Sequence, residues 1–261
     1  MQAQATGIAL WKFVAVGLLA GLLGGGFGIG GGLILVPSLI FIGLDRHRAH
    51  ATSLAGIVLI AITGALSYGL SGSIALDVGV TIGVGGVVGS FFGATAMNRM
   101  SARGLTIVFG LVLLVAGTRM VFGGAPEPGV IDLGPVGEIA AALGIGLVAG
   151  FFAGIAGIGG GVVNVPSMVF LIGLPQLVAQ GSSFVAVVMT TTAASFVNLR
   201  NKRLIPREGV FVGLGGAAGA LTSSQIALGA NEDTLRMLLG VLVLFVALRT
   251  LYRVLRAAQS D

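Results

Sequence analysis

The sequence contains one glycine-rich segment twice, and this duplication constrains the fold more than any other feature. The first copy, GGGFGIGGGLILVPSLIF, covers residues 24–41, and the second, AGIAGIGGGVVNVPSMVF, covers residues 153–170. With Pro37 aligned to Pro166, more than half of the aligned positions around these segments are identical. The register continues after a one-residue shift in pairs that include Ser53 with Ser183, Gly83 with Gly213 and Arg119 with Arg249. A repeat of about 110 residues is too long for a solenoid unit, so we expect two copies of one fold.

The composition is that of an integral membrane protein. Hydrophobic residues make up 56% of the chain and charged residues 9%, and the mean hydropathy is +1.07. A soluble domain usually carries about 25% charged residues. The net charge of +5 could suit a nucleic acid, but the basic residues form short clusters between apolar runs, where they read as topology signals. We therefore expect a lipid bilayer as the surroundings and no nucleic-acid partner.

Ten apolar runs follow one another, five in each half of the chain. They lie at roughly residues 8–23, 33–44, 51–70, 76–97, 104–122, 138–152, 162–174, 181–199, 209–228 and 234–251. Runs of about 20 residues span a bilayer as helices, whereas shorter ones are better read as re-entrant or interfacial pieces. The first two runs of each half are short and are joined by a glycine tract. Each half is therefore predicted to be one glycine-tipped broken hairpin followed by three transmembrane helices.

Charge in equivalent loops predicts that the two halves have opposite orientations. Residues 45–50 are basic while their partners 175–180 are uncharged, and residues 71–76 are free of basic side chains while their partners 201–206 are strongly basic. Because cytoplasmic loops carry an excess of Lys and Arg, equivalent loops should lie on opposite sides. A parallel repeat with four spans per half is the alternative, but it would place Lys202 outside.

These patterns predict an all-α polytopic membrane protein of two inverted-topology repeats, with both termini cytoplasmic. The expected parts are a first transmembrane repeat at residues 1–122, an acidic extracytoplasmic linker at 123–138 and a second, inverted repeat at 139–261. A homodimer is a candidate assembly.

The glycine tracts are candidate binding elements. Backbone that is neither helix nor closed sheet is tolerated in a membrane only inside the protein or beside water, and paired breaks in inverted repeats indicate the central site of a transporter. The candidate backbone ligands are Gly30, Gly31, Gly32, Gly159, Gly160 and Gly161, which can approach a substrate closely. The alternative is that these glycines only permit tight helix packing.

The prolines suggest where the second arm of each hairpin begins. Proline is favoured at the first helical position, so we expect helix N-termini near Pro37 and Pro166, with free amides around Ser38 and Ser167. Such N-termini, with their positive dipole end, bind anions.

The doubled motif resembles a known family. GIGGGLILVPS and GIGGGVVNVPS, each followed by a small-polar helix start (HATSL and QGSSF), look like the sulfite exporter TauE/SafE family of bacterial membrane transporters. The resemblance covers nearly the whole chain. It implies movement of sulfite or a small organosulfur anion such as sulfoacetate across a bacterial inner membrane. The copies differ at Leu35 against Asn164 and at residues 60–62 against Thr190, Thr191 and Thr192, which gives the central cavity one more polar wall.

Other polar residues have two interpretations. Thr52, Ser53, Ser182 and Ser183 could cap helix starts or contact the substrate, and Asn164 could cap or bind; we include all of them, and Thr191, among the candidate site residues. Tyr68 lies near a predicted membrane face, where aromatic residues commonly anchor a helix.

The predicted function is export of an anion by alternating access, with no enzymatic activity. The expected partner is a small anionic substrate, a sulfite or organosulfonate, and no cofactor or metal is expected. All carboxylates fall in predicted loops or at helix ends, so no intramembrane proton relay is evident. An anion leaving a negatively charged interior gains about 2.3 kcal/mol per charge per 100 mV, so export needs no coupling ion. The alternative is a passive channel, or an importer of a sulfur oxyanion, with the hairpins as its filter.

Overall fold

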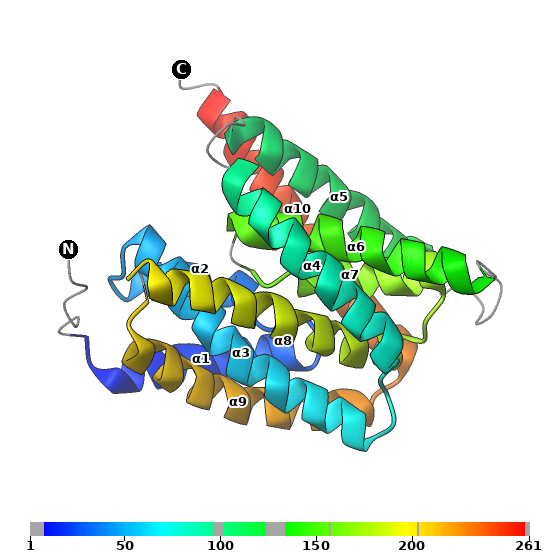
Figure 1. Cartoon of the computed structure of the whole chain (residues 1–261), viewed down its shortest axis with the longest axis horizontal. Helices are drawn as coiled ribbons and strands as arrows, with labels where there is room; N and C mark the ends of the chain where they lie inside the picture. The colour runs from blue at the N-terminus through cyan, green and yellow to red at the C-terminus, as the bar shows by residue number, and fades with distance from the viewer. Residues whose placement is uncertain (1–7, 97–101, 124–133, 157, 203, 259–261) are drawn as a thin grey trace.

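All regular elements in the described part of the chain are helices (Figure 1). The computed structural model describes residues 8–96, 102–123, 134–156, 158–202 and 204–258. The elements are α1 (Leu10–Gly25), α2 (Gly32–Phe41), α3 (Arg46–Leu70), α4 (Leu76–Ala96), α5 (Ala102–Phe122), α6 (Gly134–Ala156), α7 (Gly161–Ser167), the π-helical turn η1 (Met168–Ile172), α8 (Gln176–Arg200), α9 (Pro206–Leu228) and α10 (Glu232–Ala258). Six of them, α3, α4, α6, α8, α9 and α10, are long and apolar enough to cross a membrane.

A helix break at each glycine tract is confirmed. Between α1 and α2, Gly28, Gly30 and Gly31 have φ values of +73° to +75°, and between α6 and α7, Gly159 and Gly160 have φ values of +78° and +85°. Side chains with a Cβ rarely adopt this left-handed conformation, so glycine makes the reversal of the chain possible. Each hairpin therefore turns on residues that the two copies share.

The predicted starts of the second arms are wrong. Helix α2 begins at Gly32 and α7 at Gly161, each preceded by a glycine in the left-handed region. Pro37 and Pro166 lie inside these helices, about a turn and a half beyond their first residues. A proline beyond the first turn cannot donate the helical hydrogen bond to the carbonyl of residue i−4, and its ring crowds that carbonyl, so it perturbs the helix. After Pro166 the helical ladder widens into η1, as is common where an α-helix is perturbed.

The first arm of the second hairpin is longer than predicted. Helix α6 has 23 residues and begins at Gly134, inside the segment that the charge pattern assigned to the linker, whereas its partner α1 has 16 residues. Its early residues Pro135 and Gly137 read as a loop in the sequence, but proline is well tolerated at the start of a helix. The first arms of the two hairpins therefore differ in length by about two helical turns.

The first arm of each hairpin packs against the other half of the chain. A Cβ at Gly17 in α1 would lie 2.0 Å from Val212 O in α9, and a Cβ at the equivalent Gly146 in α6 would lie 2.2 Å from Ile82 O in α4. The backbones of these helix pairs are therefore in direct contact, the arrangement that small residues permit in bilayers. The two halves thus exchange their first arms.

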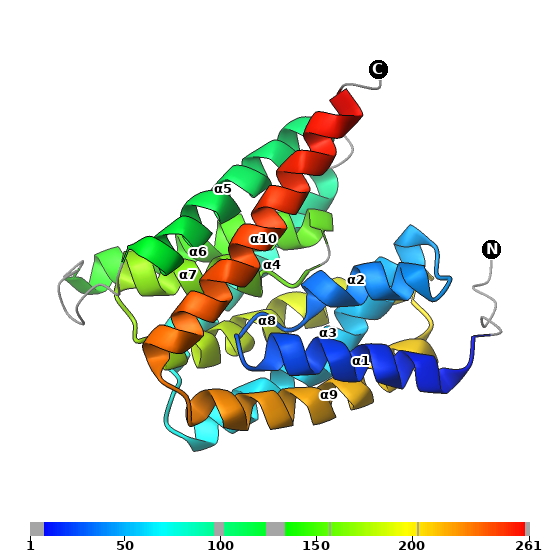
Figure 2. The same cartoon turned by 180° about the vertical axis from the view of Figure 1, so that it is seen from behind.

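The helix pair α5–α10 breaks the equivalence of the halves (Figure 2). Helix α5 packs on α7 and α10 packs on α5 and α8, and the pair belongs to the same hydrophobic core as α6 and α7, to which Leu113 and Val243 contribute. The core around α1 and α2 contains, among the described residues, only Leu235 from this helix pair. Consequently Ile40 in α2 is 40% exposed, whereas its partner Val169 is 3% exposed. The pair covers one hairpin and leaves the other open.

Candidate functional site

The two glycine tips meet at the centre of the helix bundle. A Cβ at Gly32 would lie 2.7 Å from Ile158 Cα of the second tip, and a Cβ at Gly161 would lie 2.6 Å from Gly28 O of the first. Each tip therefore leaves no room for a side chain on the other. The structure brings these segments together although about 130 residues separate them in the sequence.

Helices α3 and α8 pass the two tips near their own midpoints. A Cβ at Gly30 would lie 3.0 Å from Ile57 and 3.2 Å from Val187, and a Cβ at Gly159 would lie 3.4 Å from Val187 and 3.5 Å from Ile57. Ile57 and Val187 are equivalent positions of the two halves. The meeting point of the tips thus lies between α3 and α8, where both copies contribute in the same way.

The first helical amides of α2 and α7 lie at this meeting point. The first backbone hydrogen bonds of the second arms run from Ile34 N to Gly31 O and from Val163 N to Gly160 O, each at 3.0 Å. The backbone amides that come before Ile34 and Val163 lie at the N-terminal ends of these helices, where an amide has no carbonyl partner within its own helix. An anion at the tips would meet these groups and the positive ends of the helix dipoles.

Two hydroxyl groups hold the first tip. Ser183 Oγ donates to Gly28 O at 2.8 Å, and Tyr68 OH lies 3.1 Å from Gly26 O and 3.0 Å from Gln180 Oε1. Tyr68 is fully buried, so the predicted role as a membrane-face anchor is wrong. Sequence reasoning missed Tyr68 and Gln180 because neither residue has an equivalent of the same type in the other half.

Three candidate residues are buried with an unpaired polar atom. Thr52 and Ser53 are fully buried and Asn164 is 2% exposed, and Thr52 Oγ1, Ser53 Oγ and Asn164 Oδ1 have no hydrogen-bond partner among the described residues. A buried polar group without a partner costs roughly 1–3 kcal/mol, so each one requires an explanation. Atoms that a transported solute can reach are one such explanation.

Capping does not explain the four small hydroxyl residues. Helix α3 begins at Arg46 and is capped by Asp45, which accepts from His47 N and Arg48 N. Helix α8 begins at Gln176. Thr52, Ser53, Ser182 and Ser183 therefore lie well inside their helices. Ser182 instead accepts a hydrogen bond from Ala75 N at 2.9 Å and so fixes the start of α4.

Threonines beside the second tip are turned to their own helix. Thr191 Oγ1 donates to Val187 O at 2.6 Å, and it is the Thr191 methyl group that would meet a Cβ at Gly159. Thr190, which belongs to the polar wall expected from the sequence, donates to Ala186 O at 3.0 Å and lies 3.3 Å from Gly159 O. Its hydroxyl is thus closer to the second tip than that of Thr191.

The proline and serine residues of the motif lie away from the tips. Pro37 is exposed, Pro166 is buried, and Ser38 and Ser167 are half-buried, all of them more than a turn beyond the start of α2 or α7. In the described structure these residues therefore belong to the second arms, and the tip consists of the glycines before them.

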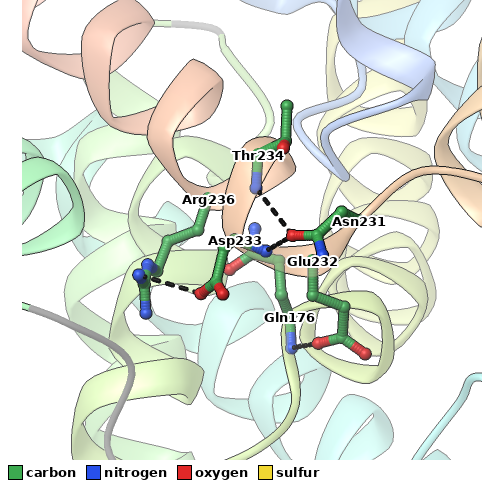
Figure 3. Close-up of polar contacts among 6 residues, drawn as sticks. All are labelled: Gln176, Asn231, Glu232, Asp233, Thr234 and Arg236. Carbon is green, nitrogen blue, oxygen red and sulfur yellow. Dashed lines mark hydrogen bonds and ion pairs between the residues drawn. The ribbon is translucent and has the colours of Figure 1, made fainter.

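Charged residues lie at the ends of the helices, and two of their contacts join separate helices. At one end, Arg48 Nη2 pairs with Glu208 Oε1 at 3.0 Å. At the other, Glu232 Oε2 accepts from Gln176 N at 2.8 Å and so caps α8 from α10 (Figure 3). The same corner includes the pair Arg236 Nη2 to Asp233 Oδ1 at 3.0 Å. The described tip region itself contains only backbone, hydroxyl, amide and apolar groups.

Six candidate membrane spans around paired, buried helix breaks define a multi-pass membrane protein. The family model described as Sulfite exporter TauE/SafE matches residues 2–128 and 142–261. The chain therefore belongs to the TauE/SafE family and is a membrane transporter, as its doubled motif suggested.

Curated relatives support this assignment. A "Probable membrane transporter protein" of Xylella fastidiosa is 28% identical over 250 residues, which cover 91% of this chain and 92% of the relative. YunE of Bacillus subtilis, also described as a probable membrane transporter protein, is 26% identical over 205 residues, covering 70% of this chain and 75% of the relative. Both similarities are to proteins whose printed descriptions name no substrate.

Proposed function

We propose that the protein exports sulfite or a small organosulfur anion such as sulfoacetate across the inner membrane by alternating access. The observation that carries this proposal is the meeting of two glycine tips between α3 and α8, beside buried hydroxyls that have no hydrogen-bond partner in the described part of the chain. Backbone amides and hydroxyls together suit a small oxyanion, because they donate hydrogen bonds without a fixed countercharge. The family description supports the choice of a sulfur oxyanion.

The proposed substrate ligands follow the tips. The glycines at 30–32 and 159–161 contribute backbone, and Thr52 and Ser53 contribute the unpaired hydroxyl groups. Asn164 borders the same region, but its unpaired atom is Oδ1, which accepts hydrogen bonds and does not donate them. Ser182, Ser183 and Thr191 border the same region but already have partners. Pro37, Ser38, Pro166 and Ser167 act at a distance, by shaping the second arms.

The topology we propose is two inverted repeats with cytoplasmic termini. A Cβ at Gly181 would lie 2.1 Å from Ser73 O, so the turn at residues 71–75 lies beside the start of α8. The equivalent turn at residue 201 follows the other end of α8, about 30 Å away. The basic residues of this second turn favour the cytoplasm. Opposite placement of equivalent turns is what inversion requires.

The unequal cover of the two hairpins supports alternating access. In transporters built from inverted repeats, alternating access is largely a rigid-body movement of one repeat or bundle against the other around a fixed site. Here α5–α10 packs on α7 and leaves α2 open, so the opposite state would have the pair on α2. A passive channel with the same filter would need no such exchange. The direct contact between the tips also favours a gated transporter over an open pore.

Transport by purified protein in liposomes tests the proposal. We expect saturable uptake of sulfite or sulfoacetate that is accelerated when the side of origin is negative, with a change in driving energy of about 2.3 kcal/mol per charge per 100 mV. Uptake should persist without a proton or sodium gradient. Strict dependence on such a gradient at zero potential would contradict the uncoupled mechanism, and rates that rise linearly with concentration would favour a channel.

A further inference from the structure

The duplicated serine on the tip-facing side of α3 and α8 has different surroundings in the two halves. Ser53 precedes Ile57 by one helical turn and Ser183 precedes Val187 by one turn, so each serine lies on the stripe of its helix that contacts the tips. Both side chains are fully buried. Ser183 donates to Gly28 O at 2.8 Å, whereas Ser53 Oγ has no partner among the described residues.

Neighbouring residues strengthen this difference. Tyr68 supplies a second hydroxyl to the first tip at Gly26 O, and Tyr68 also reaches Gln180 on α8. The residue equivalent to Tyr68 in the second half is Asn198, whose Nδ2 donates to Ala194 O of its own helix at 2.9 Å. Two hydroxyl groups therefore hold the first tip, that of Tyr68 from the first half and that of Ser183 from the second.

The hydroxyl group of Ser53 donates no hydrogen bond to any described residue. Its hydroxyl can donate one hydrogen bond, and leaving that bond unmade in a buried place destabilises the fold. A solute oxyanion at the tips would accept this bond, and a charge-assisted bond of this kind is stronger than one between neutral groups.

We propose that the two copies have divided the role of this serine: Ser53 donates its hydroxyl to the transported oxyanion, and Ser183 fixes the first glycine tip. This inference rests on the proposed function for the identity of the ligand. The role of Ser183 does not depend on the proposed function, because it concerns the fold alone.

Matched variants of the full-length protein in detergent test the division. Thermal unfolding is followed for Ser53→Ala, Ser183→Ala, Ser53→Thr and Ser183→Thr, each with and without sulfite or sulfoacetate. Ser183→Ala should lower the Tm by about 2–4 °C, the shift that the loss of one buried hydrogen bond causes in a protein of this size, and it should keep the rise in Tm that the anion causes.

Ser53→Ala should behave in the opposite way. Its Tm without anion should equal or exceed that of the wild type, and its Kd for the anion should increase about 10- to 100-fold because a hydrogen bond to a charged group is lost. Ser53→Thr, which keeps the hydroxyl, should restore binding. A Kd for Ser53→Ala within two-fold of the wild type would overturn the ligand role, and equal losses of Tm in both alanine variants would overturn the division.

The same data separate this inference from the proposed function. If neither anion stabilises the wild type, the proposed substrate class is wrong and the ligand role of Ser53 is refuted with it. The comparison of Tm values without anion would still decide whether Ser183 fixes the tip.

Discussion

At the scale of single residues, the glycines of the tips have two separate requirements, and substitutions can separate them. Gly31 has φ of +75°, and a Cβ there would lie 2.6 Å from Ala20 O. Gly72, in the turn between α3 and α4, has φ of +71° but no atom within 4 Å of a Cβ. Gly31 and Gly72 therefore share the left-handed conformation, but of the two only Gly31 also lies close to the backbone of another helix.

Alanine at these two positions should have unequal effects. Gly72→Ala should cost only the strain of the left-handed conformation, about 1–2 kcal/mol. Gly31→Ala should cost more, because the first hairpin must also open, and it should abolish transport. Thermal unfolding and liposome uptake measure the two effects. Equal stabilities and equal transport rates for the two variants would show that the close approach at Gly31 is unimportant.

Residue identity alone could not predict which polar atoms are unpaired. The sequence singled out Thr52, Ser53 and Asn164 because small polar residues in apolar runs are conspicuous, and all three side chains are buried. It could not distinguish Ser53 from Ser183, since the two have the same type and the same position in the repeat. It also misjudged Tyr68, because an aromatic residue near a helix end looks the same whether it faces headgroups or the bundle interior.

At the scale of elements, helix ends depended on contacts that the sequence does not display. The glycine breaks were predictable, since glycine tracts with a doubled pattern have few other uses in a membrane. The starts of α2 and α7 were not, because a proline near the beginning of a helix is compatible with a start either at the proline or a turn earlier. The cap of α8 by Glu232 was not predictable either, because the carboxylate comes from a distant helix.

Packing of the exchanged arms can be tested on one helix. A Cβ at Gly146 would lie 2.2 Å from Ile82 O, whereas two residues earlier Gly144 has nothing within 4 Å. Gly146→Ala should therefore force α6 away from α4 and lower the free energy of unfolding by about 1–3 kcal/mol. Gly144→Ala should be neutral or stabilising by up to about 1 kcal/mol, because alanine favours the helix.

Chemical denaturation in detergent measures this difference. Similar destabilisation by both variants would mean that glycine matters in α6 for flexibility in general, and not for the contact with α4. No destabilisation by either variant would contradict the close backbone contact that the structure describes.

At the scale of the whole molecule, the account depends on two copies of one fold in opposite orientations, with their glycine tips in contact. Duplication was evident in the sequence, and five of the six predicted spans are among the six candidate spans of the described chain; the sixth is α6, which was predicted as a short hairpin arm, and not α5. The placement of α5–α10 on the second half was not predictable, because both halves supply the same kind of apolar surface and only the folded chain shows which one is covered.

The orientation of the two copies is tested most directly at Ser71 and Asn201, which are equivalent residues in exposed turns. The chain contains no cysteine, so Ser71→Cys and Asn201→Cys each introduce a single thiol. In intact cells with permeabilised outer membranes, a membrane-impermeant maleimide should label Ser71→Cys, and it should label Asn201→Cys only after the inner membrane is opened. Labelling of both thiols from the same side would contradict the inverted arrangement.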